Sequence, residues 1–491
     1  MSWQEFDYLA SPDSGAEDKV YGVHWNAMMH HGLRTPCYYL IFKDGSTFYA
    51  RDGVTGKVTS NSDFAALLNN RIPTMTSGGI LHIVVGDYPV STQINVIDDI
   101  IVEGEGDGTR LYLPNGQPSV AEKHRILDVY NHENVLIRDL CLDGNYTNNN
   151  VTGLAYEGTL RVVNSRHVDI ERCTVKNARV FGIIVYSLSG TGEDVYDVNV
   201  YKCKVIECKW NGISYYHSTA SSHAAPHDCL CKNNYVIGSC DIGLDMMATG
   251  SNNLPYDVTF KDNFVIADGT SGYGSTTDTW IPIRIEAGND IKVIDNRVFN
   301  VKGTNTHSIF DSSVYDVQRL IITGNKCYGA SYAAIRLIKS NDSIVKHNTI
   351  MTSGRGILVE TDRNIIKDNV ITSTYYGIVE TAGAAYNKYF LNNLENCTNK
   401  MSLSGSDYDI KDNIGYVTEA QGTSTILNGN SSVVVTHGLA GTPDYIYVTG
   451  DHSQVASLYV DTITSTQFTI HTTYGNVTAN RVICWYAKFK P

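Results

Sequence analysis

The chain lacks a long hydrophobic run: its 491 residues contain no stretch of about 18 consecutive apolar residues, the length that a membrane-spanning helix needs. Its start, MSWQEFDYLASPDSG, has neither a basic segment nor an apolar core, so it does not predict a secretory signal. Positive charge is also scarce, with 38 Lys and Arg against 51 Asp and Glu and a net charge of −13. An acidic chain without a basic stripe disfavours nucleic acid or an anionic membrane as a partner.

Proline is rare as well, with 11 residues against 42 Gly and 32 Tyr, and helical periodicity is scarce. This composition is typical of a protein built from strands and turns. The exception is the segment 61–71, where Ser62 or Asp63 can cap a short helix whose apolar face includes Phe64 and Leu67.

The eleven cysteines are an odd number, and none of them forms a tight metal-binding motif. Cys229 and Cys231 are separated by a single residue, and Cys173 and Cys203 lie 30 residues apart (203 − 173), which is one repeat of the pattern described next. We expect buried free thiols rather than disulfides or metal ligands.

The sequence repeats itself between about residues 170 and 416. Asn recurs just before a short apolar strand, at Asn234, Asn263, Asn296, Asn325, Asn348, Asn369, Asn393 and Asn413. The steps range from 20 residues (413 − 393) to 33 residues (296 − 263), and a second strand, often opened by Gly, lies between successive marks. Such repeats predict a parallel β-helix whose coils stack at about 4.8 Å, with the Asn side chains bonded to one another in the turns.

The fold class expected is all-β, a right-handed parallel β-helix with an N-terminal helix cap and a small C-terminal β-sandwich. Four parts are predicted: an arm and hairpin over 1–60, the capped β-helix over 61–416, a linker rich in Gly, Ser, Thr and Asn over 417–430, and a sandwich of five alternating strands over 431–491.

The start of the β-helix carries a family resemblance. After the helix come GGILHIVVGDYPV and IIVEGEGDGTRLYL, in which the matching residues are Gly78, Gly79, Gly86, Tyr88, Gly104, Gly106 and Thr109. Over residues 60–415 the chain resembles the pectate-lyase-like superfamily of polysaccharide lyases, polygalacturonase-type hydrolases and phage tailspikes. The resemblance implies a polysaccharide partner and an extracellular, cell-surface or virion-associated location, and a tailspike-like protein would also imply a homotrimer. It implies no reaction type, because one scaffold supports many reactions.

Candidate site residues follow from aligning the Gly-opened strands on their first apolar residue, since successive side chains of a strand point to opposite sides. We expect the catalytic residues to be Asp245, Arg284 and Glu286. We expect the substrate-binding residues to be Tyr186, Tyr216, His217, Arg336 and Glu360. Stacked coils would place the three catalytic residues within about 10 Å of one another on one solvent-facing sheet.

This residue set suits a polysaccharide. Two carboxyl groups roughly 5–10 Å apart can cleave a glycosidic bond. On a uronic-acid polymer, an Arg neutralises the sugar carboxylate while a base removes the C5 proton, and Tyr216 or His217 are candidates to carry it. The leading hypothesis is a polysaccharide lyase or glycoside hydrolase acting on an acidic or complex glycan in a groove of the β-helix. The alternative is a non-catalytic, glycan-binding tailspike-like or surface adhesin protein, and a solvated face without a ligand is the third interpretation.

The sequence assigns no metal ligand. The NTD, DD and GHG strands of polygalacturonase-type enzymes are absent, and the paired-Asp calcium site of pectate lyases is not recognisable, so calcium stays open as a cofactor implied only by the resemblance. The loop over 217–232 carries a flexibly spaced set, His217, His223, His227 and Asp228. The N-terminal histidines have no acidic or Cys partner at a suitable spacing, and we expect them to belong to the arm: His24, His30 and His31.

Overall fold

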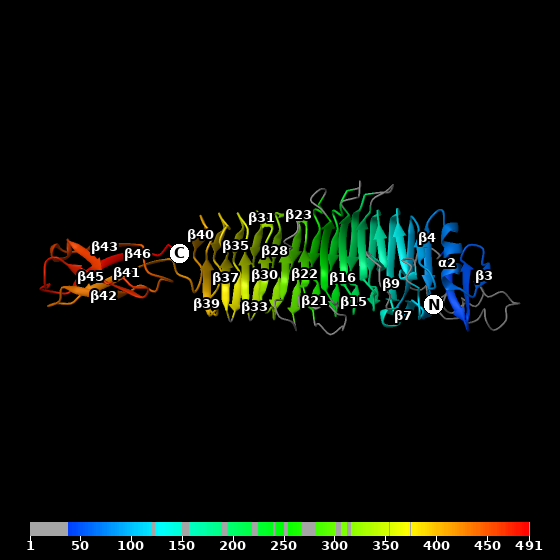
Figure 1. Cartoon of the computed structure of the whole chain (residues 1–491), viewed down its shortest axis with the longest axis horizontal. Helices are drawn as coiled ribbons and strands as arrows, with labels where there is room; N and C mark the ends of the chain where they lie inside the picture. Colours follow the sequence, from blue (N-terminus) through cyan, green and yellow to red (C-terminus); the bar gives the residue numbers. More distant parts are fainter. Residues whose placement is uncertain are drawn as a thin grey trace, which may run out of the picture. The chain divides into compact units, whose positions relative to one another are not determined.

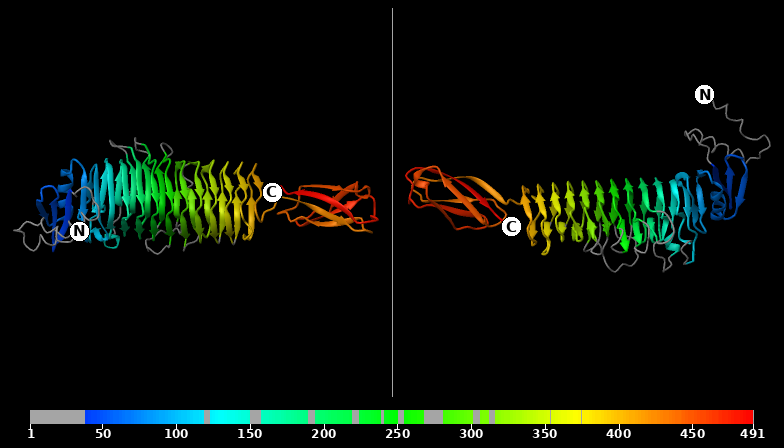
Figure 2. Two further views of the ribbon diagram at one scale, coloured as in Figure 1. Left: turned by 180° about the vertical axis from the view of Figure 1, so that it is seen from behind. Right: turned by 90° about the horizontal axis from the view of Figure 1, so that it is seen from above.

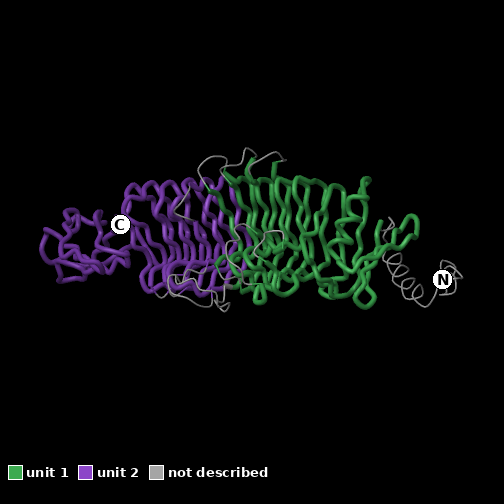
Figure 3. The backbone as a smooth tube through the Cα atoms, turned by 45° about the vertical axis from the view of Figure 1, so that its right-hand side comes forward, with its two compact units in different colours: residues 1–275 green, residues 276–491 purple. Residues whose placement is uncertain are grey.

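A computed structural model of the chain describes residues 38–118, 123–149, 157–188, 194–218, 224–238, 241–249, 254–267, 281–300, 306–311, 316–352, 354–373 and 375–490. The predicted arm, with His24, His30 and His31, lies outside the described residues. The chain divides into two compact units, residues 1–275 and residues 276–491 (Figure 3).

The first unit begins with the predicted hairpin and helix. Strands β1 (Tyr39–Asp44) and β2 (Thr47–Asp52) pair antiparallel, and β3 (Val58–Asn61) pairs with β2. In helix α2 (Phe64–Arg71), the first turn is capped by the Asp63 side chain, which accepts a hydrogen bond from the Ala66 backbone N–H at 3.0 Å. The helix buries Phe64, whose ring centroid lies 4.6 Å from that of Tyr88, so α2 packs on the apolar end of the first coils.

The coils of the first unit stack into parallel sheets (Figures 1 and 2). The sheet that bears the predicted site residues contains β6 (Ile94–Val96), β8 (Leu127–Tyr130), β10 (Gly158–Val163), β13 (Phe181–Ser187), β16 (Asn211–Ser218) and β19 (Ile242–Thr249). The remaining strands of these coils are β4 (Gly79–Ile83), β5 (Gly86–Pro89), β7 (Ile100–Tyr112), β9 (Glu133–Asp143), β11 (Arg166–Glu171), β12 (Thr174–Lys176), β14 (Tyr196–Tyr201), β15 (Lys204–Ile206), β17 (Leu230–Lys232), β18 (Tyr235–Ile237), β20 (Thr259–Lys261) and β21 (Phe264–Ala267).

The second unit, taken by itself, has the same architecture. Its site-bearing sheet contains β22 (Ile281–Ile285), β26 (His307–Asp311), β30 (Ala333–Leu337), β34 (Arg355–Val359), β37 (Tyr376–Glu380) and β39 (Asn399–Leu403). The remaining strands of its coils are β23 (Gly288–Asn289), β24 (Lys292–Ile294), β25 (Arg297–Asn300), β27 (Val317–Gln318), β28 (Ile321–Thr323), β29 (Lys326–Tyr328), β31 (Ser340–Asn341), β32 (Ile344–Lys346), β33 (Thr349–Thr352), β35 (Ile365–Lys367), β36 (Val370–Ser373), β38 (Lys388–Phe390) and β40 (Asp409–Lys411). The fold is a right-handed parallel β-helix, as the repeats predict.

A ladder of buried asparagines holds one turn of each coil in the second unit. Asn369 Oδ1, for example, accepts hydrogen bonds from the backbone N–H and the Nδ2 of Asn348 at 3.0 and 2.9 Å. The ladder consists of Asn296, Asn325, Asn348, Asn369, Asn392 and Asn413. The prediction of Asn393 is wrong by one position, because Leu391 adopts the left-handed conformation (φ 54°) that precedes each ladder residue.

The described cysteines are free thiols, and all of them except Cys484 are buried, as predicted. Burial raises the pKa of Cys229 and Cys327 to about 12, so both remain protonated thiols at neutral pH. These cysteines therefore act as small apolar core residues.

The segment 419–488 forms two antiparallel sheets, one with β41 (Glu419–Ile426), β46 (Arg481–Lys488) and β43 (Tyr445–Gly450), the other with β42 (Ser432–Thr436), β45 (Gln467–Thr472) and β44 (Leu458–Asp461). Their core includes Ile426, Val435, Phe468 and Ile483. The five strands expected over 431–491 are β42 to β46. The predicted linker differs from the structure, because β41 lies within it and pairs along its whole length with β46. A polar sequence suits β41, since this edge strand leaves alternate side chains exposed.

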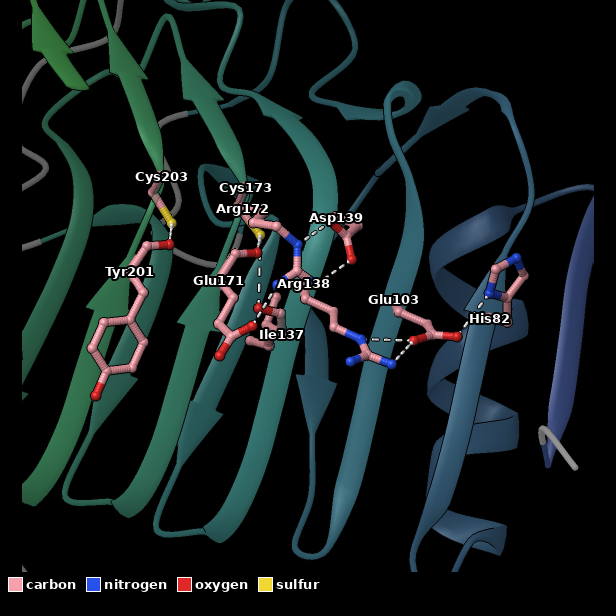
Figure 4. A network of polar contacts seen from close by, with 10 residues as sticks. All are labelled: His82, Glu103, Ile137, Arg138, Asp139, Glu171, Arg172, Cys173, Tyr201 and Cys203. Carbon is pink, nitrogen blue, oxygen red and sulfur yellow. Dashed lines mark hydrogen bonds and ion pairs between the residues drawn. The ribbon is translucent and has the colours of Figure 1, made fainter. Parts of the chain in front are cut away.

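A polar network crosses adjacent coils of the first unit (Figure 4). Glu103 Oε1 lies 3.0 Å from His82 Nδ1, and Glu103 Oε2 accepts hydrogen bonds from Arg138 Nε and Nη2 at 2.8 and 2.6 Å. In the next coils Arg172 Nε and Nη2 each lie 2.7 Å from the Asp139 carboxylate. Burial alone would raise the pKa of Glu103, but the hydrogen bonds from His82 and Arg138 hold that pKa below its usual range.

Candidate functional site

The outer face of the site-bearing sheet in the second unit carries arginine side chains between core residues. Ile283 and Ile285 are fully buried, and Arg284 between them points outward, with 19% of its side chain exposed. Arg284 Nη2 lies 3.4 Å from Glu286 Oε2. These two predicted catalytic residues therefore form a partly shielded ion pair on the outer face.

Arg336 is the centre of a second group on this face. Its Nε donates a hydrogen bond to Glu360 Oε2 at 2.9 Å, so two predicted substrate-binding residues lie in direct contact. The Arg336 guanidinium carbon also lies 5.6 Å from the Phe310 ring centroid and 5.4 Å from that of Tyr332. A guanidinium beside two aromatic rings keeps its charge while its flat surface is shielded from water.

Arg355 brings a second guanidinium to the same place. Its guanidinium carbon lies 4.5 Å from the Tyr332 ring centroid, on the ring that Arg336 also approaches. Whereas Arg336 has Glu360, no carboxylate within the described ranges pairs with Arg355. Arg355 is partly exposed, so an anion can reach its guanidinium group.

His307 completes the group, which we name the arginine–aromatic cluster: His307, Phe310, Tyr332, Arg336, Arg355 and Glu360. The His307 ring stacks on Phe310 with centroids 4.8 Å apart and meets Tyr332 edge-on at 5.2 Å. Burial, aided by the charges of Arg336 and Arg355, lowers the pKa of His307 to about 3. His307 is therefore neutral at physiological pH and adds an aromatic surface without adding charge.

Sequence reasoning missed His307, Tyr332 and Arg355. Strict alternation from Ile357, the first apolar residue of the strand that Gly356 opens, predicts that Gly356 faces outward and Arg355 faces the core. In the structure Gly356 faces the core, since a Cβ at this position would lie 2.3 Å from Ile371 Cγ2. The strand therefore begins with a bend, and the residue before the glycine faces outward as well. An alignment that also read the residue two positions before the first buried Ile of each strand would have found Arg355, before Ile357, and His307, before Ile309.

The sequence predicts that Asp245, in the first unit, faces solvent, and this prediction is wrong. The residue is fully buried, and its Oδ2 accepts a hydrogen bond from Asn211 Nδ2 at 2.6 Å. Strand alternation determines which side of the sheet a residue occupies, but it does not determine whether that side is covered. In the structure, Asp245 is a hydrogen-bonded carboxylate within a packed layer on the outer side of the sheet.

Tyr186 and Tyr216 are also buried rather than exposed, with 6% and 1% of their surfaces accessible. Their ring centroids lie 4.7 Å apart, and the Tyr216 hydroxyl donates to Thr249 Oγ1 at 3.2 Å. Both rings belong to an apolar cluster that includes Phe181 and Ile184. They contribute to packing on the outer side of this sheet and offer no open ring face for a sugar.

His217 lies on the opposite side of strand β16 from Tyr216. It is fully buried and pairs in register with Ser187 and Ala248, which are buried as well. Neither of its ring nitrogens has a hydrogen-bond partner among the described residues, and burial lowers the pKa of His217. This position does not suit the proton carrier that the sequence suggested.

The three predicted catalytic residues are divided between the two units. Asp245 belongs to the first unit, whereas Arg284 and Glu286 belong to the second. Their approach to within about 10 Å, expected from the stacking of coils, stays a prediction.

Charged side chains also occupy the outer side of the first unit's sheet at positions that the sequence did not single out. Arg161 donates from Nε and Nη2 to the Asp128 carboxylate at 2.7 and 2.9 Å. Arg125 Nη2 donates to Glu157 Oε1 at 2.8 Å. These four side chains are largely buried, and they neutralise one another across neighbouring coils.

Within the part of the chain that the structure describes, no group of three or more His, Cys, Asp or Glu is arranged to hold a metal ion. Of the loop set considered from the sequence, His227 Nδ1 lies 2.8 Å from Asp228 Oδ2, and the His227 ring stacks between Tyr196 and Tyr256. His223 lies outside the described residues.

Comparison with known families gives one partial match. Residues 278–431 match the model of the family described as periplasmic copper-binding protein (NosD). No curated protein is significantly similar to the chain in sequence.

Solved structures show the same fold at low sequence identity. The A-module of a mannuronan C-5 epimerase from Azotobacter vinelandii is 14% identical over 72% of this chain and 95% of its own, with a TM-score of 0.51. The catalytic unit of an α-1,3-glucanase from Streptomyces thermodiastaticus is 11% identical over 71% and 67%, with a TM-score of 0.51. A surface adhesin of Streptococcus pneumoniae is 13% identical over 70% and 87%, also with a TM-score of 0.51. The resemblance expected from the sequence is confirmed at the level of the fold.

Proposed function

We propose that the second unit binds an acidic polysaccharide at the arginine–aromatic cluster. The observation that carries this proposal is Arg355, a partly shielded guanidinium that lies 4.5 Å from the Tyr332 ring centroid and has no carboxylate partner among the described residues. Guanidinium groups bind carboxylates and sulfates through paired hydrogen bonds. A sugar that carries such a group would complete the charge balance of the cluster.

The remaining members of the cluster fit the body of a sugar. Phe310 and Tyr332 supply apolar ring surface for the C–H face of a pyranose. Glu360 can accept hydrogen bonds from sugar hydroxyls with one oxygen while the other holds Arg336 in place. Neutral His307 supports Phe310 by stacking and brings no additional charge that would need a partner.

Cleavage of the bound glycan is the second candidate function, and the Arg284–Glu286 pair favours it. A guanidinium beside a carboxylate on an outer face can neutralise a uronate while the carboxylate removes the C5 proton. In this proposal Arg284 and Glu286 act in a lyase or hydrolase. Solved proteins with this fold include an epimerase, a glucanase and an adhesin. The fold is thus compatible with either outcome.

The proposed partner also suggests a place of action. A protein that binds an acidic polysaccharide would act outside the cell, at a cell surface or on a virion. In the tailspike-like alternative, the chain would act as a homotrimer. In the described parts of the chain, no helix has the length and apolar character needed to cross a membrane.

Binding can be tested with a pair of variants that each remove one positive charge. Arg355→Gln should weaken binding to polygalacturonate or alginate about tenfold and reduce its salt dependence, since a desolvated charge-assisted contact is lost. The matched control is Arg363→Gln, because Arg363 lies in the turn before β35 and is already paired with Asp342 at 2.8 Å. Isothermal titration calorimetry at two salt concentrations measures both effects.

Equal losses in the two variants would show that net charge alone attracts the glycan, and an absence of measurable binding of the parent protein to either acidic polymer would contradict the proposal. The same samples decide between the two functions. New reducing ends or unsaturated uronate products indicate cleavage, whereas retention of an intact polymer indicates binding alone.

A further inference from the structure

The outer face of one C-terminal sheet carries a row of exposed tyrosines. In the sheet of β41, β46 and β43, Tyr447 pairs in register with Tyr486, and Tyr486 with Gln421. Tyr445 and Tyr447 are 52% and 65% exposed, and the ring centroids of Tyr447 and Tyr486 lie 6.2 Å apart. The alternate residues of these strands, such as Ile446 and Ala487, pack on the core of the sandwich. We name the outer residues Tyr445, Tyr447, Tyr486 and Gln421 the tyrosine face.

We propose that the tyrosine face binds a neutral polysaccharide chain, independently of the arginine–aromatic cluster. Strands β43 and β46 supply the aromatic rings of the face, and β41 supplies the amide of Gln421. Flat rings with a hydroxyl at the edge match sugars, which have apolar C–H faces bordered by hydroxyl groups. An amide beside them can both donate to and accept from those hydroxyls.

The charges bordering the face favour a neutral ligand. Lys488 Nζ donates to Glu419 Oε1 at 2.6 Å, and both residues lie in register with Tyr445 at one edge of the face. This cation and this anion therefore balance each other. An acidic glycan would have to compete with Glu419 for Lys488, and a basic peptide would have to compete with Lys488 for Glu419. A neutral sugar chain requires neither competition.

The size of the face distinguishes a sugar chain from a second copy of the protein. A tyrosine buries about 150–250 Å² when it is fully covered, so the three partly exposed side chains together offer roughly 200–400 Å². A stable protein interface needs about 800 Å² from each partner. The face is therefore too small to hold a second copy by itself, whereas its area suits a few consecutive sugar rings.

Native affinity electrophoresis of the full chain tests the proposal, with dextran, hydroxyethyl cellulose and galactomannan as neutral probes and polygalacturonate as the acidic one. We expect at least one neutral polymer to retard the protein. Tyr447→Ala should weaken that retardation about tenfold, and Tyr447→Trp should preserve it, because either ring can stack on a sugar. Tyr459→Ala is the matched control, since Tyr459 is 50% exposed on the other sheet of the same sandwich. Arg363→Gln should leave retardation by the neutral polymer unchanged, because Arg363 is already paired with Asp342.

Several results would overturn the proposal: no retardation by any of the three neutral polymers, an equal effect of Tyr459→Ala, or retardation by polygalacturonate alone. Sedimentation velocity supplies the remaining outcome, because a dimer that Tyr447→Ala dissociates would identify the face as a contact between copies. Far-UV circular dichroism verifies folding of each variant. Because Arg355 lies in the coils and the tyrosine face in the sandwich, failure of either binding proposal leaves the other testable.

Discussion

The adjacent residues Asn392 and Asn393 show how strongly one position along the chain changes the role of a side chain. Asn392 is fully buried, donates from Nδ2 to Ile366 O and Asn413 Oδ1 at 2.9 Å each, and accepts from Asn369. Asn393 is only partly buried, and its Oδ1 accepts a hydrogen bond from the exposed Glu395 N–H at 3.1 Å. The left-handed backbone at Leu391 decides which of the two enters the ladder.

We therefore expect Asn392→Ala to lower the free energy of unfolding by about 1–3 kcal/mol, because the neighbouring ladder amides and the Ile366 carbonyl lose buried partners. Asn393→Ala should change it by less than about 0.5 kcal/mol, as is usual for a position near the surface. Urea denaturation of the two variants measures the difference. Equal losses, or a larger loss at Asn393, would contradict this assignment of the ladder.

At the scale of elements, side chains on the outer faces of the coils connect neighbouring strands through ion pairs and hydrogen bonds. Glu103 on β7 joins His82 on β4 to Arg138 on β9, so three successive coils share one carboxylate (Figure 4). Glu103 is largely buried, and its hydrogen bonds hold its pKa below the usual range. Stabilisation of this kind depends on pH.

The sign of that dependence follows from the lowered pKa of Glu103. A carboxylate whose folded-state pKa is depressed contributes stability above its unfolded pKa of about 4.3, and the contribution is lost as pH falls through the folded pKa. Glu103→Gln should therefore be less stable than the parent protein at pH 7, and the gap should narrow as pH falls below about 4. Urea denaturation at several pH values tests this, with the exposed Glu395→Gln as control. A gap that widens toward acid would refute the assignment.

At the scale of the whole molecule, two kinds of core stabilise different parts of the second unit. The coils bury columns of aliphatic side chains such as Ile335 and Ile357. The sandwich has its own core, whose buried members and packed neighbours all fall between residues 420 and 489. Among the described residues, none from the coils belongs to that cluster, so we propose that the two parts fold as separate domains.

Deleting residues 419–491 removes β41 to β46 and should leave the coils folded, because the sandwich core within the described residues includes no residue of the coils. Far-UV circular dichroism should retain the β-sheet signal and a cooperative thermal transition. The full chain with Phe468→Ala, which opens a cavity in the sandwich core alone, is the matched control. Loss of the sheet signal on deletion would show that the coils depend on the sandwich.

Much of the fold was accessible without the structure. The spacing of the asparagines and the alternation of the strands predict stacked coils, since a repeat of this length can bury its apolar face only against its neighbours. The same alternation places Arg336 and Glu360 outside the core, and the structure shows them in contact. The predictions of the fold that were wrong concern turns and connections. They are the choice of Asn393 over Asn392 as a ladder residue and the assignment of β41 to a linker.

The sequence by itself determined the β-helix and the side of the sheet on which Arg284, Arg336 and Glu360 lie, because hydrogen-bonded coils force a period of two along each strand. Only the tertiary structure decided which outward positions are open. It buried Asp245 and Tyr216 in a packed outer layer, and it bent the strand start so that Arg355 lies over Tyr332. Coverage of a face and bends at corners depend on segments distant in sequence, and no local pattern encodes them.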